Sequence, residues 1–234
     1  MKTFKALSAL LTYPGRELQE AVPAIRTVLG EELLSSASVS ALEPLLVSLE
    51  SGDIYDLQER YVLLFDRSRT LSLNLFEHIH GESRDRGGAM VDLIETYRAG
   101  GFDLAGAELP DHLPVLLEFL STRPLGEARE ILADAGHILV ALAERLARRE
   151  SDYAAVLEAL VAVSGADSTT GEAQALLSQQ DDDPEDLAAL DAVWEEAQVT
   201  FGPDPSAGCP VSRDILTRMD PHVRMESAPA PTAR

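Results

Sequence analysis

Two histidine motifs carry the residue types and spacing that could do chemistry in this chain. Glu77 and His80 have the Glu-x-x-His spacing of di-iron helical bundles, and Asp134 with His137 forms a weaker version of it. A di-iron site needs two such motifs and two further carboxylates directed into one core. The second motif has the shorter Asp, and helical spacing places His137 on the same polar face as Arg145. We therefore expect surface or capping histidines and no metal site.

Other catalytic signatures are missing from the sequence. It contains no Gly-x-Ser-x-Gly motif, no phosphate-binding glycine loop and no dinucleotide-binding Gly-x-Gly-x-x-Gly motif. Cys209 is the only cysteine, which excludes an intramolecular disulfide and a thiolate metal cluster. We expect a protein that is not an enzyme and needs no cofactor. A di-iron or other metal-binding helical protein remains the alternative from a different class.

The charge balance is strongly acidic. Asp and Glu number 40 against 19 Lys and Arg, which gives a formal net charge of −21. Such a surface repels nucleic acid and anionic lipid and favours a basic partner. There is no apolar run of about 18 residues and no convincing signal peptide. We expect a cytoplasmic protein that binds no nucleic acid and does not insert directly into a membrane.

Leu and Ala dominate the apolar residues, and alternating strand patterns are absent, which predicts an all-α protein. We expect a helical-bundle-like domain of about nine to ten helices over residues 1–197, with its longest helix at about 126–149. Residues 164–186 contain seven acidic residues and no basic one, which is typical of a solvated loop. Six of the 13 prolines fall in residues 200–234, so we expect an extended, partly disordered tail over 198–234.

Two of the predicted helices can be described in more detail. Asp111 can act as the N-cap of a helix over 110–121, with Pro114 in the first turn, where a missing N–H costs little. The apolar faces of this helix and of the helix that begins at Asp53 follow helical spacing. Their buried residues should be Leu113, Leu116, Leu117 and Leu120 in the later helix and Leu57, Tyr61, Leu64 and Phe65 in the earlier one.

Taken in order, five segments resemble the assembly chaperones of respiratory nitrate reductase, the delta subunit family, and more distantly the twin-arginine proofreading chaperones. The resemblance covers about residues 3–210. The segments are Tyr61–Phe65, Leu73–His78, Gly81–Gly87, Glu108–His112, and a late group of Trp194, Val199, Phe201 and Cys209-Pro210.

The resemblance implies a chaperone that binds the N-terminal segment of the apo catalytic subunit and keeps it competent for molybdenum cofactor insertion before membrane docking. An acidic helical groove would bind a basic, amphipathic peptide. A monomer or weak dimer is expected, and a twin-arginine proofreading chaperone for another molybdoenzyme is the alternative of the same fold. The candidate peptide-binding residues are Tyr61, Phe76 and Met90 as an apolar floor and Glu77, Glu82, Glu108 and Asp111 as an acidic rim.

Overall fold

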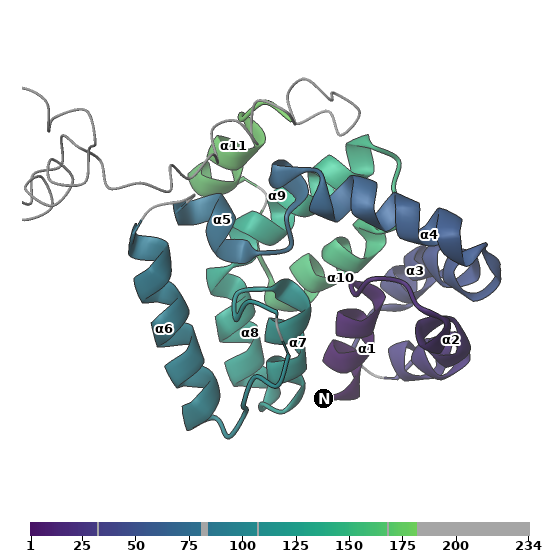
Figure 1. Cartoon of the computed structure of the whole chain (residues 1–234), viewed down its shortest axis with the longest axis horizontal. Coiled ribbons are helices and arrows are strands. Elements are labelled where there is room, and N and C mark those ends of the chain that lie inside the picture. Colours follow the sequence, from purple (N-terminus) through teal and green to yellow (C-terminus); the bar gives the residue numbers. More distant parts are fainter. Residues whose placement is uncertain (32, 81–83, 107, 168, 182–234) are drawn as a thin grey trace, which may run out of the picture. The chain divides into compact units, whose positions relative to one another are not determined.

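The computed structural model describes residues 1–31, 33–80, 84–106, 108–167 and 169–181 (Figure 1). Within these ranges the chain forms eleven α-helices and no strand, so the all-α prediction is confirmed. The elements are α1 (Lys2–Leu10), α2 (Arg16–Leu29), α3 (Ser36–Ser51), α4 (Ile54–Tyr61), a π-helical turn η1 (Val62–Asp66), a 3-10 turn η2 (Arg69–Leu71), α5 (Leu75–His80), α6 (Arg84–Ala99), α7 (Leu113–Ser121), α8 (Leu125–Asp134), α9 (Gly136–Arg148), α10 (Ala154–Ser164) and α11 (Gly171–Leu177). None of these helices has both the length and the apolar character needed to cross a bilayer.

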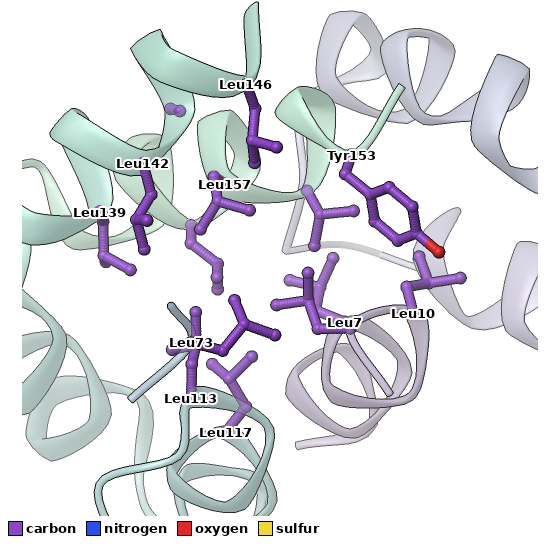
Figure 2. Packing of buried hydrophobic residues seen from close by; sticks show 14 of the residues in the cluster. Leu7, Leu10, Leu73, Leu113, Leu117, Leu139, Leu142, Leu146, Tyr153 and Leu157 are labelled. Atoms are coloured by element: carbon purple, nitrogen blue, oxygen red, sulfur yellow. The ribbon is translucent and has the colours of Figure 1, made fainter. Parts of the chain in front are cut away.

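The first helix lies against α7 and α2 and is almost completely packed on its apolar side. Phe4, Leu7 and Leu10 recur at helical spacing and are fully buried. Figure 2 shows Leu7 on the side of Leu113 and Leu117 of α7, and Leu10 beside the ring of Tyr153. The hydroxyl of Ser8 donates a hydrogen bond of 2.7 Å to the carbonyl of Pro114, which fixes the register of the two helices.

A second layer of the core forms around α9, which contacts α10, α11 and α8. Leu139, Leu142 and Leu146 lie on one face of α9 and are fully buried. They point toward Leu157 of α10 in Figure 2, and Tyr153 extends from the start of the same helix toward α1. All the residues predicted to be buried on α7 and on the helix after Asp53 lie in this continuous core, which confirms the two apolar faces.

The predicted long helix over 126–149 is wrong, because the chain breaks it at Ala135. That residue has φ −88° and ψ 3°, so α8 ends at Asp134 and α9 begins at Gly136. A Cβ at Gly136 would lie 2.6 Å from the Cβ of Ala166. The start of α9 therefore approaches the segment after α10 closely, and only glycine fits there.

The stretch over 164–186 is not a loop throughout, which corrects that expectation. It contains α11, whose N-cap Thr170 accepts a hydrogen bond from the backbone N–H of Ala173. Ala173 and Leu176 are buried on the core, although the helix has only seven residues. The predicted domain boundary at 197 and the predicted tail over 198–234 lie outside the described residues.

Helical spacing predicts Arg145 on a polar face, and this prediction is wrong. Its side chain is fully buried. Its Nη1 donates to the carbonyl of Thr70 at 2.9 Å, and its Nη2 donates to the carbonyl of Leu176 at 2.6 Å. Its Nε lies 2.8 Å from Oδ1 of Asp181. A single cation thus connects α9 with η2, α11 and the segment that follows α11.

Candidate peptide-binding site

Two of the segments that carry the family resemblance cross each other in space. Residues around Asn74 and His112 form an isolated antiparallel bridge. The N–H of Leu113 donates to the carbonyl of Leu73 at 2.8 Å, and the N–H of Leu75 donates to the carbonyl of Asp111 at 3.1 Å. The start of α5 is therefore fixed against the start of α7, although 38 residues separate Asn74 from His112.

Asp111 caps a different helix from the one predicted. The N-cap of α7 is His112, and Pro114 falls in the first helical turn, as expected. The Oδ2 of Asp111 instead accepts a 3.0 Å hydrogen bond from the backbone N–H of Phe76 at the start of α5. The side chain is fully buried, and this burial raises the pKa of the carboxyl above its usual value, although the Phe76 bond and Arg86 act in the opposite direction.

Glu77 faces the same crossing from α5. Its Oε1 accepts hydrogen bonds from Nη2 of Arg86 at 3.1 Å and from Nδ2 of Asn74 at 3.3 Å. Burial acts to raise its pKa, but hydrogen bonds from Ser72 and Asn74 and the charge of Arg86 hold the pKa of Glu77 below its ordinary value. The same Nη2 of Arg86 lies 3.9 Å from Oδ2 of Asp111. Arg86 therefore connects α6 with two carboxylates at the crossing.

A hollow of about 410 Å³ opens between α1, η1 and α7, and we name it the acidic hollow. Its apolar surface comes from Tyr61, Tyr13, Pro114 and Val115, and its carboxylates are Asp66, Glu108 and Glu118. Ser8, Thr12 and His112 complete the lining. Acidic groups around an apolar floor suit a basic amphipathic peptide, because the floor buries its apolar side chains while the rim pairs with its cations.

A second hollow of about 400 Å³ adjoins the first through Asp66, which lines both. Its lining includes the guanidinium groups of Arg69 and Arg86 and the carboxylate of Glu77, so we name it the mixed-charge hollow. Phe65, Ser68, Ser72 and Asn74 form the rest of its wall. A larger hollow of about 630 Å³ lies among α9, α10 and α11 and contains none of the predicted site residues.

The titratable groups of the acidic hollow influence one another. Partial burial raises the pKa of Asp66, and the charge of Glu108 adds to this, whereas His112 acts against it. Burial lowers the pKa of His112, although Glu108, Asp111 and Asp66 oppose that effect. The hollow therefore holds its carboxylates beside a histidine that resists protonation.

The structure brings some predicted site residues together and separates others. Tyr61 and Glu108 line the acidic hollow, and Glu77 lines the mixed-charge hollow. Phe76 and Met90 are half-buried on α5 and α6 and lie outside the lining of both hollows. Glu82 lies outside the described residues.

Tyr61 is a core residue that shows one edge to the acidic hollow. It is 5% exposed, and its hydroxyl donates a 2.9 Å hydrogen bond to the carbonyl of Leu11. Its ring lies against those of Phe65 and Tyr153, with centroids 4.9 and 6.3 Å away. These contacts hold α4 and η1 in the core, which gives Tyr61 a structural role. A role of Tyr61 in peptide binding stays a prediction.

Sequence reasoning missed Asp66 and Glu118. Asp66 directly follows the Tyr61–Phe65 segment and ends the π-helical turn η1. Glu118 is the exposed residue of the otherwise apolar α7 and pairs with Lys5 of α1 at 3.5 Å. A carboxylate inside an apolar helical segment was the signal that could have identified Glu118.

The two histidine motifs are separated and engaged in other contacts. Asp134 ends α8 and His137 lies in α9, so the break at Ala135 removes them from a common helical face. His80 packs edge-on against Phe76, with ring centroids 5.9 Å apart. In the part of the chain that the structure describes, no three His, Cys, Asp or Glu side chains form a group suited to a metal ion.

Over the described residues the chain is an all-helical protein with an acidic, apolar-floored hollow. A profile described as nitrate reductase delta subunit matches residues 16–159. The nitrate reductase molybdenum cofactor assembly chaperone NarJ of Escherichia coli K12 is 43% identical over 205 residues, which is 86% of each chain. The probable assembly chaperone NarW of the same strain is 39% identical over 214 residues, 89% of this chain and 87% of NarW. The probable chaperone NarJ of Bacillus subtilis 168 is 33% identical over 163 residues, 68% of this chain and 86% of its own. The chain belongs to the nitrate reductase delta subunit family.

Proposed function

We propose that this protein is an assembly chaperone of nitrate reductase and not an enzyme. It binds the N-terminal segment of the apo catalytic subunit and keeps that subunit competent for molybdenum cofactor insertion before membrane docking. The relatives named as assembly chaperones support this role. The observation that carries the binding mode is the acidic hollow, whose lining includes Tyr61, Glu108 and His112 from two of the segments that carry the resemblance.

The client segment that fits this hollow is a basic amphipathic peptide. Apolar side chains of the peptide contact Tyr13, Pro114 and Val115, and its cations pair with Glu108 and Glu118. The net charge of −21 steers a basic segment toward the protein and increases the association rate, while apolar contact supplies most of the affinity. The protein acts in the cytoplasm as a monomer or weak dimer, and it needs no cofactor, nucleic acid or membrane insertion of its own.

Calorimetric titration with a synthetic peptide from the N-terminus of a nitrate reductase catalytic subunit tests the role of the rim. A double variant, Glu108→Gln with Glu118→Gln, should bind several-fold more weakly at about 0.1 M salt and show a smaller salt dependence. The matched control is Glu130→Gln with Glu158→Gln, two exposed carboxylates on α8 and α10 outside the acidic hollow. Equal loss in both variants would mean that only net charge matters. Absence of binding by the unchanged protein would contradict the proposed function.

A second titration tests the apolar anchor on α5. If Phe76 contacts the peptide, Phe76→Ala should weaken binding more than Glu82→Gln, by on the order of 1–2 kcal/mol. Both variants must keep the helical content and melting temperature of the unchanged protein. A lower melting temperature for Phe76→Ala with unchanged peptide affinity would identify Phe76 as a core residue only.

A further inference from the structure

Arg86 is the internal counter-ion of a group of carboxylates at the mixed-charge hollow. It comes from the first turn of α6, and its side chain is 20% exposed. Its Nη2 contacts Glu77, which is one third exposed, at 3.1 Å and lies 3.9 Å from fully buried Asp111. Only the first of these distances is a hydrogen bond, so Arg86 satisfies one carboxylate better than the other.

One carboxylate oxygen near this hollow has no donor in the described part of the chain. The mixed-charge hollow is lined by Asp66 and Glu77 and by Arg69 and Arg86, and the carboxylate of Asp111 lies 3.9 Å from Arg86 outside this lining. The Oδ1 atom of Asp111 is buried and has no hydrogen-bond partner among the described residues. A buried carboxylate oxygen without a donor costs free energy, so the site favours a ligand that brings additional N–H groups.

The first turns of α6 leave space for the Arg86 side chain to move. A Cβ at Gly87 or Gly88 would meet no atom of the described residues within 4 Å, so these residues leave open space beside this part of the helix. Tyr97 of α6 is buried three turns further along, and its hydroxyl donates to the carbonyl of Pro110 at 2.7 Å. The helix is thus anchored through Tyr97, and Arg86 can leave Glu77 without disturbing that anchor.

We propose that Arg86 occupies, in the free protein, the place that a guanidinium or ammonium group of the bound client takes. This inference rests on the proposed function and adds a subsite to it. A peptide in the acidic hollow passes Asp66, which lines both hollows, and extends a basic side chain into the mixed-charge hollow. That side chain displaces Arg86 from Glu77 and supplies donors to the carboxylates. Arg86 thereby acts as a built-in competitor that weakens the binding of segments lacking a cation at this position.

Two synthetic peptides of identical amphipathic sequence test the proposal, one with arginine and the other with neutral citrulline at a single position. The arginine position is scanned along the basic flank, and affinities are measured by calorimetry with the full chain. At the correct position, Arg86→Gln should bind the arginine peptide about 3- to 10-fold more tightly than the unchanged protein does. Its affinity for the citrulline peptide should stay the same. Arg86→Lys retains a competing cation and should remain near the unchanged protein.

Arg98→Gln is the matched control, because it removes an exposed positive charge from the last turn of the same helix. Equal tightening by Arg98→Gln would show an effect of net charge alone and overturn the proposal. The proposal would also be overturned if a folded Arg86→Gln variant bound the arginine peptide no more tightly than the unchanged protein at any position. In that case, binding of the peptide by the unchanged protein would still support the proposed function. If Arg86→Gln does not fold, Glu77→Gln provides the test, since it should remove the preference for arginine over citrulline. If the unchanged protein bound neither peptide, this result would contradict both the proposed role of Arg86 and the proposed function.

Discussion

The backbone N–H of Phe76 donates a 3.0 Å hydrogen bond to the buried carboxylate of Asp111, which lies 35 residues further along the chain. The bond satisfies a donor at the start of α5 that has no partner within its own helix. Together with the bridge between Asn74 and His112, it places α5 beside α7. The wall of the mixed-charge hollow therefore depends on a contact between two distant segments.

Removal of this carboxylate should destabilise the protein. Asp111→Ala leaves the partly buried N–H of Phe76 without its acceptor, which should cost about 1–3 kcal/mol of unfolding free energy. Asp111→Asn keeps an acceptor oxygen and should cost less. Urea unfolding followed by circular dichroism measures both. Equal losses for the two variants would mean that charge, and not the hydrogen bond to Phe76, gives Asp111 its role.

The hydroxyl of Tyr61 provides a second test, which separates stability from binding. Tyr61→Phe leaves the buried carbonyl of Leu11 without its 2.9 Å partner and should cost about 1 kcal/mol of stability. The ring remains, so peptide affinity should be unchanged. Tyr97→Phe is the matched variant, because its hydroxyl makes an equivalent bond to Pro110. A loss of peptide affinity in Tyr61→Phe at unchanged stability would assign the hydroxyl to binding.

The apolar faces could be predicted from sequence because burial of Leu and Phe follows helical spacing, which is a local property. Leu113, Leu117 and Phe119 of α7 are buried as their spacing requires. The polar residues were harder to place. Asp111 is predicted as the N-cap of α7 and lies one position before the actual N-cap. The hydrogen bond that its carboxylate accepts comes from the N–H of Phe76, in a different helix. Partners that are distant in sequence leave no periodic signal.

The candidate site was only partly accessible from sequence for the same reason. Glu77 and Glu108 line the two hollows, and their role in peptide binding stays a prediction. Asp66 was missed because the π-helical turn that presents it does not follow ordinary helical spacing. Arg86 lies in the Gly81–Gly87 segment of the resemblance. Its pairing with Glu77 could not be predicted from sequence, because it depends on how α6 lies against α5.

Stability should fall as the pH is lowered from about 7 to 5.5, because burial lowers the pKa of both His78 and His112 in the folded protein. Their ordinary pKa is about 6.5, so below that value the unfolded chain binds more protons than the folded one. The unfolding free energy then decreases with falling pH until the folded pKa is passed. The raised pKa of Asp111 acts in the opposite sense at lower pH.

Thermal melting across this pH range measures the effect, with His78→Gln and His112→Gln as the informative variants. Glutamine at position 78 can still donate to the carbonyl of Ser72, which accepts a 2.8 Å hydrogen bond from Nε2 of His78. Each variant should therefore flatten the pH dependence without a large loss of stability at pH 7.5. A pH dependence that is unaltered in the double variant would assign it to other groups.

Loss of the buried cation of Arg145 should destabilise the protein strongly. Arg145→Met fills a similar volume but removes the donors that Arg145 offers to the carbonyls of Thr70 and Leu176, and the cation beside the carboxylate of Asp181. We expect a loss of about 2–4 kcal/mol, below the range for a fully buried pair, because the Asp181 side chain is 32% exposed and water can solvate it. Arg148→Met removes an exposed pair with Glu144 one turn along the same helix and should cost about 0.5 kcal/mol or less. Urea unfolding measures both variants, and equal losses would show that the contacts of Arg145 with η2 and α11 do not stabilise the fold.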